Sequence, residues 1–121
     1  DVPVTLCAAS GYDGTIADNR ITVAAHLSAE SVGIGYQLMT RPSQCVIAGN
    51  IIDNRGPTPL PLTVAAVPAF TGTAAITGNR VEAVLTEGLA GRLQQSRNLD
   101  RGGRALLPGR SDRIPGYPID S

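Results

Sequence analysis

The pattern Ile-x-x-Asn-x-Ile/Val occurs three times in this chain, and it constrains the fold more than any other feature of the sequence. It is found in "GTIADNRI" at 14–21, "CVIAGNII" at 45–52 and "AAITGNRV" at 74–81. The three asparagines, Asn19, Asn50 and Asn79, are 31 and 29 residues apart. So regular a spacing indicates a repeated unit of about 30 residues that stacks on its neighbours.

Aligning the asparagines also aligns apolar residues, which we expect to form two interior columns. The first column, three residues before each asparagine, contains Ile16, Ile47 and Ile76. The second column, two residues after each asparagine, contains Ile21, Ile52 and Val81. The residue before each asparagine is Asp18, Gly49 or Gly78, all types that tolerate a left-handed backbone in a turn.

Each asparagine follows a β-prone run by roughly fifteen residues, at 3–10, 33–40 and 61–68. Turn-rich links at 11–14, 41–43 and 69–72 separate these runs from the asparagine segments. No segment has a helical stripe, and Val, Ile, Thr and Ala dominate. Each unit is therefore predicted as strand, turn, strand, asparagine turn and strand. A loop of variable length follows, at 28–31 in the first unit and 54–61 in the second.

Stacked units would place equivalent residues one strand spacing apart, so Asn19, Asn50 and Asn79 could form a hydrogen-bonded ladder. This pattern resembles the right-handed parallel β-helix of the pectin-lyase-like superfold over residues 3–87, or three coils. The resemblance implies an all-β fold, although Asp18 stands where the other units have glycine. The alternatives are a β-sandwich with asparagine-rich turns and a pilin-like domain completed by a donor strand.

We divide the chain into a repeat domain at 1–87 and a C-terminal tail at 88–121. The tail holds six of the ten arginines and few apolar residues, too few for a core of its own. Leu106, Leu107, Ile114 and Tyr117 could anchor it as a strap along the repeat domain or against an acidic partner.

The ends of a three-coil stack present a problem, because each exposes unpaired backbone and an apolar cross-section. Solenoid proteins cover such ends with caps, and no amphipathic capping helix is apparent in the sequence. We therefore expect either a longer polypeptide or coverage by other subunits. The expected partners are copies of the chain or a larger protein assembly.

The composition argues against several other classes of function. Ten basic and ten acidic residues balance, so nucleic acid is not expected as a partner. Three Tyr, one Phe and no Trp provide few rings for stacking on sugars. No apolar run approaches ~18 residues, so no membrane span is expected. The compartment is not fixed by the sequence, and an extracellular or particle-associated location is favoured.

Few residues suggest chemistry. His26 is the only histidine, and no other donors stand at metal-ligand spacing, so neither a metal nor a cofactor is expected. Cys7 and Cys45 do not form a C-x-x-C motif. They are expected to be small apolar thiols in strands, with a disulfide between neighbouring coils as the alternative.

The weak catalytic candidates are Asp53 and Glu82, each three residues after its asparagine. Stacking would place them about one strand apart, near the separation used by retaining glycosidases, with Arg20 and Arg80 beside them. The expected interpretation is a pair on the solvent face. The sequence therefore predicts a non-enzymatic structural or assembly module. The alternative is a fragment of a β-helical protein that binds or degrades polysaccharides.

Overall fold

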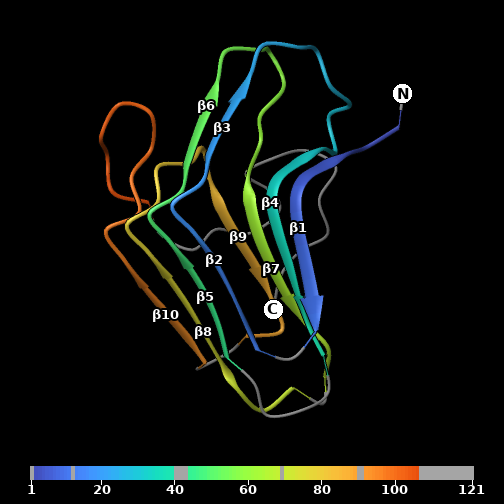
Figure 1. Ribbon diagram of the computed structural model, residues 1–121, viewed down its shortest axis with the longest axis vertical. Helices are drawn as coiled ribbons and strands as arrows, with labels where there is room; N and C mark the ends of the chain where they lie inside the picture. Colours follow the sequence, from blue (N-terminus) through green and yellow to red (C-terminus); the bar gives the residue numbers. More distant parts are fainter. Residues whose placement is uncertain (1, 12, 40–43, 69, 90–91, 107–121) are drawn as a thin grey trace.

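The computed structural model describes residues 2–11, 13–39, 44–68, 70–89 and 92–106, and this part of the chain contains ten β-strands and no helix. The expectation of an all-β chain is confirmed (Figure 1). The strands are β1 (Thr5–Gly11), β2 (Gly14–Ala17), β3 (Arg20–Val23), β4 (Val32–Leu38), β5 (Gln44–Ala48), β6 (Ile51–Asn54), β7 (Leu62–Ala66), β8 (Thr73–Thr77), β9 (Val84–Glu87) and β10 (Leu93–Ser96).

The strands form three sheets in which every pairing between named strands is parallel. Sheet A has the order β1-β4-β7-β9, sheet B the order β2-β5-β8-β10, and sheet C pairs β3 with β6. Isolated parallel bridges from Ile51 to Arg80 and from Arg80 to Leu99 prolong sheet C. Parallel pairing needs a long return path between paired strands, and here the other two sheets provide that path.

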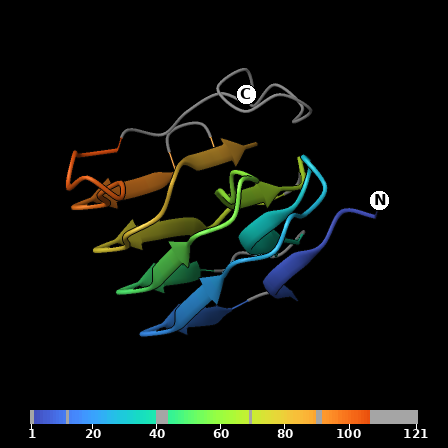
Figure 2. The same cartoon turned by 90° about the horizontal axis from the view of Figure 1, so that it is seen from above.

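The chain passes through sheets A, B and C in turn and then repeats the sequence of sheets, as Figure 2 shows from above. We call each passage a round. Round 1 contains β1, β2 and β3; round 2 contains β4, β5 and β6; round 3 contains β7, β8 and Arg80; and round 4 contains β9, β10 and Leu99. Each predicted β-prone run (3–10, 33–40 and 61–68) corresponds to the strand that opens a round.

The register places like residues above one another. Ile16 pairs with Ile47, and Ile47 pairs with Ile76, so the first predicted column lies in sheet B. Ile21 pairs with Ile52 in sheet C. Burial increases away from round 1: Ile21 is half-buried and Ile16 is 7% exposed, whereas Ile47 and Ile76 are fully buried.

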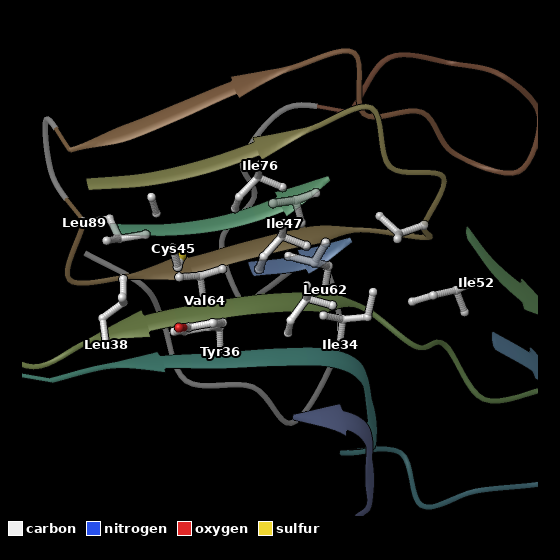
Figure 3. Packing of buried hydrophobic residues seen from close by; sticks show 14 of the residues in the cluster. Ile34, Tyr36, Leu38, Cys45, Ile47, Ile52, Leu62, Val64, Ile76 and Leu89 are labelled. Carbon is white, nitrogen blue, oxygen red and sulfur yellow. The ribbon is translucent and has the colours of Figure 1, made fainter. Parts of the chain in front are cut away.

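The core lies between the sheets, where side chains from sheet A meet those from sheet B (Figure 3). Alternation along the strands sends every second side chain inward. The main contributors from sheet A are Ile34, Tyr36, Leu38, Leu62 and Val64. Cys45, Ile47, Ala74 and Ile76 contribute from sheet B. Burial of the large apolar side chains provides the main stabilisation, since each is worth ~1.5–3 kcal/mol on transfer from water.

The stack continues past residue 87, the predicted end of the repeat domain. β10 pairs with β8, and its Gln95 pairs with Ile76 of the first column. Round 4 escapes a search for a 30-residue period because it is short: Asn98 follows Asn79 by only 19 residues. Within the tail, Leu106 packs against the core, while Leu107, Ile114 and Tyr117 lie outside the described residues.

In the part of the chain that the structure describes, no helix is long and apolar enough to cross a membrane.

Candidate functional site

A sharp corner joins sheet B to sheet C in every round, and one backbone conformation builds it. The residue after each sheet B strand has a positive φ: 58° at Asp18, 68° at Gly49, 67° at Gly78 and 59° at Arg97. An asparagine follows in all four rounds. The left-handed residue bends the chain sharply, and the asparagine that follows is buried in rounds 2, 3 and 4.

The four asparagines form one continuous hydrogen-bonded ladder along this corner. The backbone N–H and Nδ2–H of Asn19 both donate to Oδ1 of Asn50, each over 3.0 Å. Asn50 donates in the same way to Asn79, over 3.0 and 2.9 Å. Asn79 donates to Asn98 over 3.1 and 2.8 Å. All the side chains of the ladder therefore point their Oδ1 atoms toward round 1.

A second set of bonds ties the asparagines of rounds 2, 3 and 4 to the preceding round. Nδ2 of Asn50 donates to the Ile16 carbonyl at 2.9 Å, and Nδ2 of Asn79 donates to the Ile47 carbonyl at 2.8 Å. Nδ2 of Asn98 donates to the Ile76 carbonyl at 2.7 Å. Asn50, Asn79 and Asn98 are at most 1% exposed, so leaving any of these groups unpaired would cost ~1–3 kcal/mol.

The second predicted column, Ile21, Ile52 and Val81, lies just beyond this corner. Ile52 is 6% exposed and Val81 is 1% exposed. The Ile52 N–H donates to the Arg80 carbonyl and the Val81 N–H to that of Leu99, so the column continues after sheet C has ended as a named pair of strands. The ladder and the two apolar columns thus occupy one edge of the core.

Asp53 lies on sheet C beside Thr22, and arginines surround its carboxylate. Its Oδ2 accepts Arg55 Nε at 3.2 Å and lies 3.0 and 3.8 Å from guanidinium nitrogens of Arg55 and Arg20. Both arginine side chains are about two-thirds exposed, so each ion pair contributes at most ~1 kcal/mol.

Glu82 makes different contacts. Its Oε1 accepts the Leu60 N–H at 2.9 Å and also accepts Nδ2–H of Asn54, a residue that is 4% exposed. Asn54 in turn donates to the Thr58 carbonyl at 2.6 Å. Glu82 therefore fastens the 55–61 loop to round 3, a role that the spacing of the asparagines did not predict.

The two carboxylates line one hollow of about 210 Å³ on the sheet C side of the stack. Three arginines, Arg20, Arg80 and Arg101, line it as well. The hollow brings together the pair that the sequence analysis singled out, with cationic groups around it. Its chemistry suits an anionic ligand better than a neutral one, because the guanidinium groups outnumber the carboxylates.

The other candidate residues do not form a site. His26 is exposed on a loop, where it lines a hollow with Ser28 and Pro57. Cys7, in β1, and Cys45, in β5, are both free thiols. Burial raises the pKa of Cys45 to about 11, which keeps it protonated at neutral pH. Among the described residues, no three His, Cys, Asp or Glu side chains gather where they could hold a metal ion.

Sequence reasoning missed Asn98 and the loop fastening by Asn54 and Thr58. Asn98 lacks the usual markers, because Gln95 replaces the column isoleucine and Arg97 replaces the glycine. Thr58 Oγ1 donates to the Leu27 carbonyl at 2.6 Å and accepts the Leu27 N–H at 2.9 Å. The only sequence signal for such a contact is a threonine in a loop, which is too common to predict it.

Comparison with protein-family models, curated proteins and solved structures gives no match. No relative therefore supplies an activity or a ligand, and the geometry of the ladder and the hollow is the basis for inferring the function.

Proposed function

We propose that this chain is a non-enzymatic structural module, a short right-handed parallel β-helix that stacks on copies of itself or on a larger assembly. The assembly could be a virion, a tail-like particle or a cell-surface structure. The observation that carries the proposal is the asparagine ladder through four rounds. A buried ladder of this kind fixes the register of every round, which is what a stacking scaffold requires.

The parallel strand pairs support the β-helix over the β-sandwich, because sandwiches are built of antiparallel sheets. Each return to sheet A passes through sheets B and C, as the coil of a solenoid does. The right hand of the coil follows from the general preference of crossovers between parallel strands.

The use of the polar groups also supports a structural role. Glu82 holds the Leu60 N–H and Asn54, so its carboxylate has little freedom to move a proton for a substrate. Asp53 faces Arg55 and Arg20 and can attract or repel charge at the surface.

The experiment is an assay of polysaccharide cleavage on the wild type, on Asp53→Asn and on Glu82→Gln. In Glu82→Gln the new amide keeps an oxygen acceptor for Asn54 and Leu60, so we expect this variant to fold. Polygalacturonate and alginate are the substrates, and release of reducing or unsaturated ends is the readout. A structural module releases none above buffer in any of the three proteins. Release that Asp53→Asn abolishes at unchanged thermal stability would overturn the proposal.

A second candidate function is binding of an acidic polysaccharide without cleavage. The three arginines around the 210 Å³ hollow favour it, since guanidinium groups bind carboxylates in bidentate geometry. Calorimetric titration with oligogalacturonate tests it, with Arg20→Ala and Arg80→Ala as the variants. Binding that weakens at least tenfold in both variants and falls with salt would support this function. Heats of injection equal to the heat of dilution would rule out this second function.

A further inference from the structure

The two ends of the stack differ. At the round 4 end, residues 99–106 fold back antiparallel, so that Leu99 bridges Ala105 and the Leu106 N–H donates to the Asn98 carbonyl at 2.8 Å. Asp100 holds this turn through its Oδ1, which accepts the N–H groups of Gly102 and Arg104, each at 2.9 Å. Asn98 is 1% exposed, so the ladder is covered at this end.

The round 1 end is open. β1, β2 and β3 are the edge strands of the three sheets, and all three edges lie at this end (Figure 2). Proteins protect edge strands with proline, charge or bulges, yet β1–β3 contain no proline and only one charged residue, Arg20. Val2, Val4 and Leu6 are 81%, 39% and 41% exposed at the same end.

The side chain of Asn19 lacks two hydrogen-bond partners that the other ladder asparagines have, as far as the described residues show. In the other rounds, Oδ1 of each asparagine accepts two N–H groups from the asparagine of the round before. Among the described residues, nothing donates to Oδ1 of Asn19, and nothing plays the part of the isoleucine carbonyl that receives the second Nδ2–H. Oδ1 and the second Nδ2–H of Asn19 would both be paired by a strand that has a free carbonyl and, three residues later, an asparagine. Ile16 and Asn19 have this spacing themselves.

We propose that the round 1 end is a docking surface for a further parallel β-coil, contributed by polypeptide outside residues 1–121. The coil carries an asparagine that donates its backbone N–H and Nδ2–H to Oδ1 of Asn19. Its carbonyl three residues earlier accepts the Nδ2–H of Asn19. The inference deepens the proposed structural role and rests on it, because it names the end that stacks and the chemistry of the partner.

A second copy of this chain does not have that chemistry. The ladder end that would have to donate its amide groups is that of Asn98, which is only 1% exposed and whose carbonyl accepts the Leu106 N–H. Two round 1 ends brought together would run antiparallel and would present Oδ1 to Oδ1. Because the ladder has a direction, the partner coil must run parallel to round 1 and present free amide N–H groups to Asn19.

The strand register defines a direct test, in which an added coil takes the place of residues 1–3. Cys7 pairs with Ile34, and Ile34 with Leu62, so Val4 occupies the position of residue 59. A second copy of residues 32–58 joined to Val4 therefore enters sheet A in register. In this extended chain the added copy of Asn50 lies beside Asn19.

Thermal unfolding and amide exchange are measured for four proteins: the parent and extended chains, each with and without Asn19→Ala. The extension should raise Tm by ~5 °C or more. Asn19→Ala should lower Tm by more in the extended chain than in the parent. Exchange at Thr15 and Thr22, in the edge strands β2 and β3, should slow in the extended chain. As a control, Asp100→Ala, which removes the two bonds to Gly102 and Arg104 at the covered end, should lower Tm equally in both chains.

Two outcomes overturn the inference. One is an Asn19→Ala effect of equal size in both chains, which would mean that the added coil does not continue the ladder. The other is a parent chain that forms a dimer by light scattering and that Asn19→Ala converts to a 12.5 kDa monomer, since the occupant would then be a second copy. Neither outcome bears on the polysaccharide assay, so failure here is distinguishable from failure of the structural role.

Discussion

Asn50 donates to Asn79 twice, from its backbone N–H and from Nδ2, and both bonds end on the same Oδ1 atom at 3.0 and 2.9 Å. Its remaining Nδ2–H reaches the Ile16 carbonyl at 2.9 Å. One fully buried side chain therefore links three consecutive rounds. The interior asparagines hold the stack together, whereas Asn19 holds only one side of its round.

Replacing Asn50 by alanine should destabilise the protein by ~2–4 kcal/mol. The change removes the four hydrogen bonds of the Asn50 side chain, to both N–H groups of Asn19, to the Ile16 carbonyl and to Oδ1 of Asn79. Asn19→Ala should cost ~1 kcal/mol or less, because this side chain is exposed. Urea unfolding followed by circular dichroism measures both changes, and equal midpoints in the two variants would contradict the ladder.

Replacing the two left-handed corner glycines, Gly78 and Gly49, by alanine should destabilise the protein by different amounts. Gly78→Ala should cost ~1–2 kcal/mol through backbone strain alone, since the nearest atom to the new Cβ is the Gly49 nitrogen at 3.9 Å. Gly49→Ala should cost more, because its Cβ would lie 2.6 Å from Oδ1 of Asp18. Denaturant midpoints measure the order, and a smaller loss in Gly49→Ala would contradict it.

Arg97 offers the reverse test at the same corner. Its φ of 59° is strained for a residue with a Cβ, so Arg97→Gly should stabilise the protein by ~0.5–1 kcal/mol. The neighbouring Ser96→Gly, inside β10, should instead destabilise by ~0.5–1 kcal/mol because a strand gains nothing from a freer backbone. A loss of thermal stability in Arg97→Gly would show that its guanidinium contributes more than the strain costs.

Gly14 and Tyr36 should be strongly coupled across the core. A Cβ at Gly14, in β2, would collide with the hydroxyl of Tyr36 and lie 3.1 Å from its Cζ. Tyr36 is 5% exposed and packed, so Gly14→Ala should cost ~1–3 kcal/mol. Tyr36→Phe should recover part of the loss when the two changes are combined. Additive effects in this double-mutant cycle would contradict the contact.

The stability contribution of the buried Cys45 thiol should depend on alkaline pH. The folded pKa of Cys45 is about 11, raised by burial from an ordinary value of 9.0. The folded state therefore holds its proton longer than the unfolded state does. The stability contribution of this thiol is complete below about pH 9 and is lost as the pH rises toward 11.

Unfolding free energies of the wild type and Cys45→Ala between pH 7 and 11 measure this contribution. The difference between the two proteins should shrink as the pH rises. A thiol reagent should also modify half-buried Cys7 long before buried Cys45. Equal modification rates, or a difference in stability that grows with pH, would contradict the burial of Cys45.

The sequence alone determined the repeat, the all-β character and the identity of the interior columns. Those inferences succeed because a stacked strand has the same surroundings in each round. The same residue types therefore suit Ile16, Ile47 and Ile76, and the three asparagines after them. Turn chemistry also contributed, since only a few residue types suit the left-handed position at Gly49 and Gly78.

Only the tertiary structure decided where the stack continues and how its ends differ. Round 4 keeps the asparagine but not the isoleucine or the spacing, because backbone pairing with β8 tolerates almost any side chain. The role of Glu82 was equally hidden, since its partners at Asn54 and Leu60 lie outside its own segment of sequence. The local sequence pattern reflects which residue types suit a strand or a turn. Contacts between rounds depend instead on the paths of the loops, which only the folded chain defines.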